Sequence, residues 1–323
     1  MSAAVWPPIS HEQLIKEEEE SLAAELEWLL NLLQENLASL KSGLQECVAL
    51  LAPEEPGSTL AVSSLRSESV KGFVTRIGTR IVKGDINLRV QTLPPPRSLP
   101  SYPIHLQNPI LLPQLSVLLN LLNQALDIID ISAWTGDPHN GSFIAGQLKL
   151  LADTIEEARQ TLKGGEDVVG GKWWEDGTSD DTLVFTIPLP PSEILPQLTP
   201  LPIQTFSPSL PSTLSFHLSI ADAALLLHIR TLAPPSQPET SLTGLSIRTR
   251  LGLASRPPVH DELDQVFQYR GEEVTVKEKV RVESQDPSLM AVMAKLSALG
   301  HAVGGWRVRV GVVMGEDVEE EGE

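Results

Sequence analysis

Residues 26–51 read LEWLLNLLQENLASLKSGLQECVALL, a stretch in which leucine recurs at regular intervals. Leucines stand seven apart at positions 30, 37, 44 and 51, and a second seven-residue series runs through positions 26, 33, 40 and 47. Alternating steps of four and three residues place both series on one side of a helix. The stretch is therefore predicted to be a helix that packs its apolar side on other helices, in a second copy or in the same chain.

The positions beside the two series help to separate a dimerising zipper from a bundle. A parallel zipper carries complementary charges there to select its partner. Here Leu22, Leu29 and Leu50 widen the apolar stripe instead, which suits a helix that packs on two sides within one chain. Leu32 lies away from the stripe and is a candidate for contact with a partner protein, the alternative being a single exposed leucine. The predicted bundle core of this helix is Leu26, Leu30, Leu33, Leu37, Leu40, Leu44 and Leu51.

Three further segments repeat apolar residues at helical spacing, over residues 111–129, 144–162 and 289–303. Pro113 fits the first turn of the first of them, where its missing N–H costs little. Gly164 follows the second and is typical of a helix end. The helical segments thus lie at both ends and in the middle of the chain, and the residues between them must leave the bundle and return.

Those intervening residues read as strands. Apolar and β-branched residues cluster or alternate in seven segments, and Ala221–Ala223 is a plausible hairpin turn between two of them. The segments are 70–77, 84–91, 181–187, 212–220, 225–232, 244–252 and 273–284. The predicted fold class is α+β: an antiparallel helical bundle built from both chain ends and the middle, with an inserted antiparallel β domain of about seven strands.

The predicted domain boundaries follow from these segments. The helical bundle domain takes residues 10–52, 104–165 and 286–304, and the β domain takes 66–93 and 178–284. Residues 94–103 and 188–211 are proline-rich and read as stiff linkers, and the acidic residues 315–323 as a disordered tail.

The composition indicates which cellular compartment and which classes of partner to expect. The 323 residues carry a formal charge of −18 and a single cysteine, so no intrachain disulfide forms and a reducing compartment is expected. No basic and then apolar leader opens the sequence, and polar residues interrupt its most apolar window, 110–131, which argues against a membrane span. The negative charge makes nucleic acid and anionic lipid poor partners.

The sequence offers no catalytic motif. Its seven histidines show no pair at ligand spacing, the glycine cluster near residue 165 fails the phosphate-loop register, and no nucleophile elbow occurs. Cys47 belongs to the apolar stripe, where a thiol usually packs. The prediction is a protein that is not an enzyme, with no catalytic residue, no cofactor and no metal.

The order of these segments resembles the Rogdi leucine-zipper-containing family, whose fungal members are a subunit of the RAVE complex. The resemblance rests on ELEWLL at 25–30, VKGFVTRIG followed by KGDINLRV at 70–90, the leucine-rich helix from residue 111, and LPSTLSFHLSIADAALLLHIRTL at 210–232. It covers about residues 17 to 303, and a family without a catalytic signature transfers no functional residue.

The resemblance implies a non-catalytic adaptor that promotes assembly of the peripheral catalytic sector of the vacuolar-type proton-pumping ATPase (V-ATPase) onto its membrane sector. The implied partners are a large propeller-containing scaffold subunit, peripheral-sector subunits of the pump and a ubiquitin-ligase adaptor. The implied location is the cytoplasm, with peripheral recruitment to vacuolar or endosomal membranes and a role in vacuolar acidification. The alternative is a self-associating structural coiled-coil protein whose zipper is its function.

Overall fold

The computed structural model describes residues 10–51, 57–64, 68–96, 99–134, 140–164, 182–183, 203–235, 260–262 and 265–315. Within them the chain is α+β, with four helices and two main antiparallel sheets. The chain divides into two compact units. The helical unit comprises Met1–Leu50, Val117–Gln160 and Ala291–Glu323, and the β unit comprises Leu51–Ser116 and Thr161–Met290.

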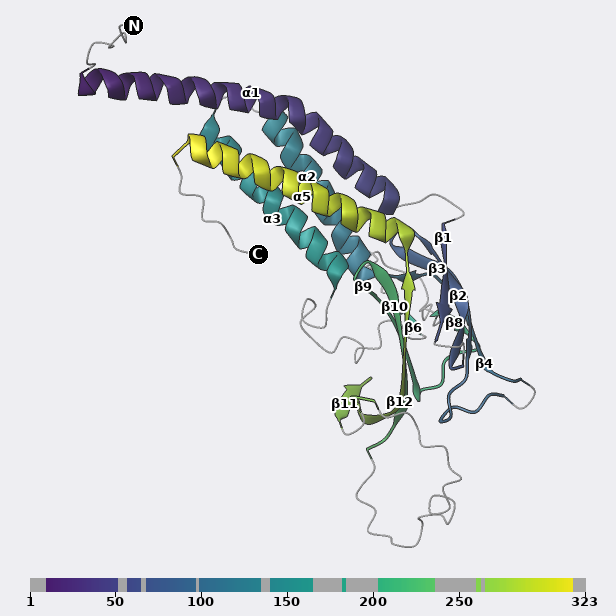
Figure 1. The fold of residues 1–323 in the computed structure, drawn as a ribbon. Helices are drawn as coiled ribbons and strands as arrows, with labels where there is room; N and C mark the ends of the chain where they lie inside the picture. Colours follow the sequence, from purple (N-terminus) through teal and green to yellow (C-terminus); the bar gives the residue numbers. More distant parts are fainter. Residues whose placement is uncertain are drawn as a thin grey trace, which may run out of the picture. The chain divides into compact units, whose positions relative to one another are not determined.

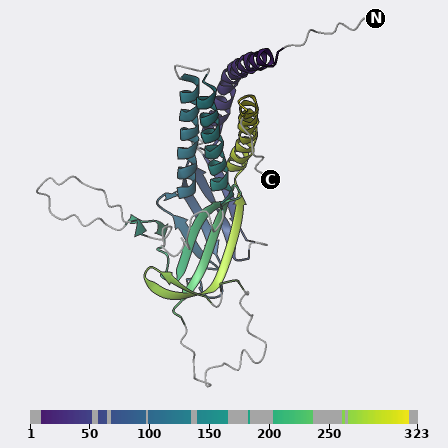
Figure 2. The same cartoon turned by 90° about the vertical axis from the view of Figure 1, so that its left-hand side faces the viewer.

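Helices supplied by three separate parts of the sequence lie side by side in the helical unit (Figures 1 and 2). They are α1 (His11–Leu51), α2 (Pro113–Trp134), α3 (Gly141–Lys163) and α5 (Pro287–Val313). α1 and α5 approach closely at Gly43, where a Cβ atom would lie only 2.8 Å from Leu299 Cδ2. The buried residues of α3 recur every three or four positions and are Ile144, Leu148, Leu151, Ile155, Ala158 and Leu162.

The larger sheet of the β unit has the order β1-β2-β3-β4-β8, with β5 paired to β3. Its strands are β1 (Ser58–Ser63), β2 (Val70–Ile77), β3 (Arg80–Leu88), β4 (Tyr102–Leu106), β5 (Ile110–Leu111) and β8 (Phe206–Ser207). The hairpin of β2 and β3 closes through Gly78, whose φ of +60° lies in the left-handed region that glycine adopts without strain.

The smaller sheet has the order β11-β12-β10-β9. Its strands are β9 (Leu214–Ala221), β10 (Ala224–Ala233), β11 (Val266–Tyr269) and β12 (Glu272–Gln285), and a separate pair joins β6 (Thr182–Leu183) to β7 (Ile203–Gln204). Asp222 and Ala223, both at positive φ, form the predicted turn between β9 and β10.

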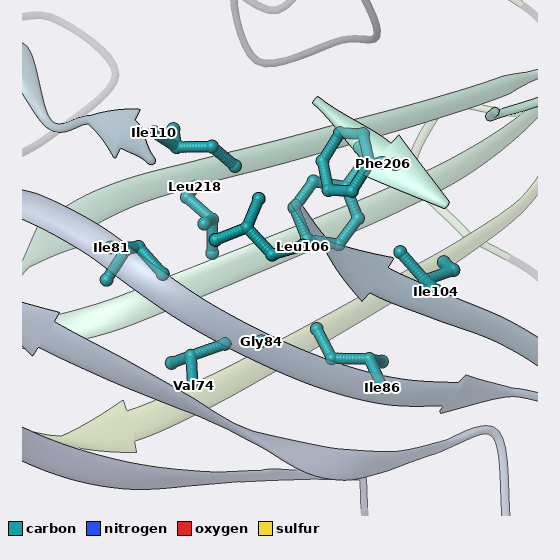
Figure 3. A pocket seen from close by; sticks show the side chains of 10 residues that line it. Val74, Ile81, Gly84, Ile86, Ile104, Leu106, Ile110, Phe206 and Leu218 are labelled. Atoms are coloured by element: carbon teal, nitrogen blue, oxygen red, sulfur yellow. The ribbon is translucent and has the colours of Figure 1, made fainter. Parts of the chain in front are cut away.

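The apolar faces of the two main sheets meet in the interior of the β unit. Phe206 of β8 and Phe216 of β9 pack edge to face, with ring centroids 4.9 Å apart. A cavity of about 10 Å³ remains beside them, lined by Val74, Ile81, Gly84, Ile86, Ile104, Leu106, Ile110, Phe206, Phe216 and Leu218 (Figure 3). A space of that size holds one water molecule at most.

The end of α3 is fixed by the turn between β9 and β10. The N–H groups of Asp222 and Ala223 donate to the carbonyls of Lys163 and Leu162, at 2.8 and 2.9 Å. Gly164 follows at φ +61°, and a Cβ atom there would lie 2.3 Å from the Ile220 carbonyl oxygen. A helix end that leaves its carbonyls unpaired is thus satisfied by the strand turn.

Several boundaries differ from the sequence-based prediction. Residues 104–111, assigned to the helical domain, include the end of β4 and all of β5, because α2 starts only at Pro113. The linker predicted at 188–211 contains β7 and β8, and the linker at 94–103 runs into β4. α5 continues past residue 304 to Val313, because Trp306 and Val310 are buried.

The sheets also hold more strands than the predicted seven or so. β1 was not among the predicted strands, and β4, β5, β8 and β11 are too short to show an alternating pattern. Residues 244–252, predicted as a strand, and the tail 316–323 lie outside the described residues.

Candidate partner-binding surface

The apolar stripe of α1 is covered within the helical unit. Leu30, Leu33, Leu37, Leu40, Leu44, Cys47 and Leu51 are buried, and Leu26 is half-buried. Gln34 donates from its side-chain amide to the Ser132 carbonyl at the end of α2, and Lys41 pairs with Asp130. The residues predicted as the bundle core are thus buried within a single chain, except Leu26, which is half-buried, and other sides of α1 are exposed.

α1 begins with a cap that the sequence supplies locally. The Ser10 hydroxyl accepts from the Gln13 N–H at 3.3 Å, and the Ser10 carbonyl accepts from the Leu14 N–H at 2.9 Å. Serine followed three residues later by glutamine is the pattern of a capping box. The helix therefore starts well before the other helices begin to cover it.

We call residues 11–25 the free segment of α1, because every one of them is exposed. In Figure 1 the first turns of α1 project past the ends of the neighbouring helices. Ile15 and Leu22 are 42% and 43% exposed, whereas Leu29, seven residues further along the same helical row, is 5% exposed. One apolar row is therefore packed inside the helical unit at Leu29 and bare before it.

A second apolar feature lies on the outer side of α1. Trp28 is 63% exposed, and Leu32, the predicted contact residue, is half-buried four residues later. Residues four apart are neighbours on a helix surface, so these two side chains form a ledge. Tryptophan is the residue type most enriched at the energetic centres of protein interfaces, and Trp28 had not been identified from the sequence.

The charge around both features is strongly negative. Residues 11–28 contain seven glutamates against Lys16 as the one lysine. Lys16 pairs with Glu20 at 3.6 Å, and the other six glutamates have no ion-pair partner among the described residues. The exposed apolar residues of α1 therefore sit in a field that attracts cationic groups.

A buried ion pair in the β unit has a structural role. Arg76 of β2 donates from Nε to Asp286 at 2.6 Å, and both side chains are fully buried. Arg76 also donates from one terminal nitrogen to the Leu51 and Gly78 carbonyls, and Asp286 accepts from the Ser288 N–H as the cap of α5. The pair joins two helix ends and a strand hairpin and offers no exposed atom to a ligand.

A polar layer covers the outward face of the smaller sheet. Arg230 donates to both carboxylate oxygens of Glu262, at 2.8 and 2.9 Å, and Lys279 pairs with Glu262 and Asp261. Burial raises the pKa of Glu262, but the hydrogen bonds from Arg230 and Lys279 outweigh it and hold that pKa below its ordinary value. In this network both carboxylates, those of Glu262 and Asp261, are paired with a cationic side chain.

His217 and His228 stand opposite each other where β9 pairs with β10 in this layer. Burial lowers the pKa of His217 to about 2 and that of His228 to about 4, and nearby positive charges, Arg230 among them, add to both shifts. Both imidazoles are therefore neutral at physiological pH, as suits structural histidines.

Metal ligands, the Cys47 thiol and one cavity bear on whether catalysis could occur among the described residues. No group of three or more His, Cys, Asp or Glu that could hold a metal occurs among them. Burial raises the pKa of the Cys47 thiol to about 11, so it stays protonated and unreactive. The cavity of Figure 3 is apolar and far smaller than the several hundred Å³ of a ligand site.

Among the described helices, one is long and apolar enough to cross a membrane. Pro113–Ala133 of α2 has the necessary length and apolar character, and 44% of this stretch is buried inside the structure. The buried core helices of soluble proteins also have this length and composition.

Comparisons with known proteins identify the family to which the chain belongs. Residues 25–310 match the family described as "Rogdi leucine zipper containing protein". The chain is 26% identical over 288 residues to "Regulator of V-ATPase in vacuolar membrane protein 2" of Schizosaccharomyces pombe, an alignment that covers 86% of this chain and 89% of that relative. With most of its length matched, the chain belongs to the Rogdi leucine-zipper family.

Proposed function

We propose that this protein is a non-catalytic adaptor subunit of a RAVE-type complex that promotes assembly of the peripheral catalytic sector of the V-ATPase onto its membrane sector. The observation that carries the proposal is the similarity to a relative named as a regulator of V-ATPase, along 89% of that relative's length. In this role the protein holds other assemblies in register, and ATP chemistry stays with the pump.

The geometry of α1 supports a binding role. The leucines that would form a zipper are buried in the helical unit, while Trp28, Leu32 and the free segment remain on the surface. A bridging protein needs a rigid scaffold with apolar residues left uncovered, and this helix provides both.

The alternative function is self-association through the leucine zipper. It would require Leu30, Leu37 and Leu44 to face a second copy, yet each is at most 3% exposed in a single chain. The burial of these residues therefore favours the adaptor over the zipper.

The partners we propose are a propeller-containing scaffold subunit, peripheral-sector subunits of the V-ATPase and a ubiquitin-ligase adaptor. The location we propose is the cytoplasm, with peripheral recruitment to vacuolar or endosomal membranes. Both proposals rest on the family and on the name of the relative.

Affinity purification of the tagged chain from native extract tests the function. We expect the scaffold subunit and peripheral-sector pump subunits to co-purify, and vacuoles of cells that lack the protein to acidify poorly. Recovery of neither partner from extract in which the pump sectors are intact would contradict the adaptor function.

Substitutions on α1 refine that experiment. Trp28→Ala combined with Leu32→Asp is expected to reduce recovery of a partner about tenfold or more, because tryptophan is often an energetic centre of an interface. Val312→Asp is the control, since Val312 is 64% exposed on a different helix, α5. Equal recovery with both variants would remove the ledge from the proposed interface while leaving the function itself standing.

A further inference from the structure

We infer that the free segment of α1 is a docking site for a basic amphipathic helix of a partner protein, which packs on Ile15 and Leu22 and pairs with the flanking glutamates. The inference relies on the proposed function only for the expectation that the partners are proteins. The family match begins at residue 25, so it leaves residues 11–24 of the free segment uncovered.

The first argument is the continuity of one helical row. Ile15, Leu22 and Leu29 stand seven residues apart, and Leu29 is buried where the other helices begin to cover α1. A seven-residue repeat is the spacing that a second helix follows in knobs-into-holes packing. A helix laid along the free segment would thus extend the packing that already exists at Leu29.

The second argument is the position of the charges relative to that row. Glu18 and Glu19 lie three and four residues after Ile15, and Glu25 lies three residues after Leu22. On a helix these spacings put acidic side chains beside the apolar row and on both sides of it. A partner helix with lysines or arginines flanking its own apolar row would pair with them, as flanking charges do in coiled coils.

The same charges disfavour other occupants. A second copy would bring two rows of glutamates together, and like charges at such positions are destabilising. Anionic lipid and nucleic acid are negatively charged and would be repelled by these glutamates. The acidic C-terminal residues of this chain would be repelled for the same reason. Charge complementarity therefore selects a cationic helix.

The third argument is the stability of the free segment. Fifteen residues without a buried side chain form a helix that is marginal in water when isolated. The run of four glutamates at 17–20 adds repulsion that a cationic partner would relieve. The N-cap at Ser10 and the packed part of the helix hold the segment ready for that partner.

Site-specific photo-crosslinking in the full-length chain tests the inference. A benzophenone amino acid at position 22, with position 312 as the exposed control, is irradiated in cells that express the protein at native level. The expected adduct is a peptide of another protein, with apolar residues at positions i, i+3, i+4 and i+7 and more lysine and arginine than acid. Adducts with a second copy of this chain, adducts with an acidic peptide, or no excess over position 312 would each overturn the inference.

The crosslinked sequence, made as a synthetic peptide, then serves as the probe for affinity. Ile15→Asp with Leu22→Asp should weaken its binding at least about tenfold, and Glu18→Lys with Glu19→Lys and Glu25→Lys should do the same. Glu35→Lys, exposed on α1 outside the free segment, is the charge control. Exchange of the peptide's basic residues for glutamate should restore binding to the lysine variant, and unchanged affinity in both variants would overturn the docking site.

These outcomes are separable from those of the proposed function. Co-purification of pump and scaffold subunits that is insensitive to the free-segment variants would leave the adaptor function intact and remove this site. Capture of a basic helix at position 22 from a protein unrelated to the V-ATPase would support the docking site but would not support the adaptor function.

Discussion

Arg76 and Asp286 are the residues whose loss should cost the most per side chain. Arg76→Met leaves the Asp286 carboxylate buried without its partner, and breaking a buried pair in this way typically costs about 3–5 kcal/mol. Chemical denaturation of Arg76→Met, Asp286→Asn and the double variant measures it. We expect the double variant to be less destabilised than the sum of the two single variants, because removing both partners leaves no unpaired charge.

Lys71→Met on the same strand is the matched control for this pair. Lys71 is exposed on β2, so its loss should change the free energy of unfolding by less than about 0.5 kcal/mol. Additive effects of the two single variants would contradict the coupling.

His217 and His228 predict a loss of stability in acid. Their pKa values in the folded protein lie below the ordinary value, so as pH falls below about 6.5 the unfolded chain takes up protons that the folded protein does not. The stability they contribute is present above pH 6.5 and is lost as pH falls toward 4, by up to about 1.4 kcal/mol per pH unit for each histidine.

Urea unfolding of the parent chain and of His228→Gln between pH 7 and pH 4.5 measures this dependence. The variant should show a shallower decline of unfolding free energy with falling pH. Its unfolded chain takes up a proton at His217 but no longer at position 228. Identical slopes would rule out His228 as a source of the acid sensitivity.

A variant in helix α1 tests whether this helix packs within the chain or dimerises. Leu37 is buried in the helical unit, so Leu37→Ala should cost about 2–5 kcal/mol as a core truncation. The melting temperature of parent and variant should not depend on concentration over a hundredfold range. A concentration-dependent melt of the parent that Leu37→Ala abolishes, with a folded monomer left behind, would restore the zipper.

The helices and the long strands could be predicted from the sequence because each carries its own periodic pattern. The row of α3 from Ile144 to Leu162 is an example, and so is the turn at Asp222. The end of α5 could not be predicted, since Gly304 and Gly305 resemble a helix stop and only the burial of Trp306 beyond them overrides it. Helix propensity is a weak prior that tertiary packing overrides.

The candidate surface could be predicted only in part. Leu32 was proposed because it lies away from the core stripe, and the same reasoning applied to Trp28 would have found the larger exposed side chain. Exposure of Ile15 and Leu22 could not be predicted, because their row continues into buried Leu29 and the sequence does not say where the neighbouring helices end. The Arg76–Asp286 pair joins residues 210 apart, and no local pattern links them.

At the scale of the whole molecule, neither unit is made from one continuous stretch. The helical unit takes three segments of the chain and the β unit takes two, so each unit needs residues from both halves of the sequence. Contacts between residues far apart must form before either core closes. The chain should therefore fold as an interleaved whole and should resist division into independent domains.

Division of the chain into residues 1–164 and 165–323 tests this interleaving. The first fragment retains α1, α2, α3 and β1 to β5 but lacks α5 and the smaller sheet, so the core face of the larger sheet is left exposed. Each fragment alone should show reduced helicity or sheet content by circular dichroism and no cooperative melt. Co-expressed, the two should co-purify and recover a cooperative transition, because together they supply every segment of both units.

The buried ion pair gives this experiment its internal control, since Arg76 lies in the first fragment and Asp286 in the second. Arg76→Met in the first fragment should weaken recovery of the complex strongly, because association would then bury an unpaired carboxylate. Lys71→Met should leave recovery unchanged, as its side chain is exposed. A cooperative melt of residues 1–164 alone with full helicity would show that the first half folds without the second. Reassembly indifferent to Arg76 would show that the buried pair does not hold the two fragments together.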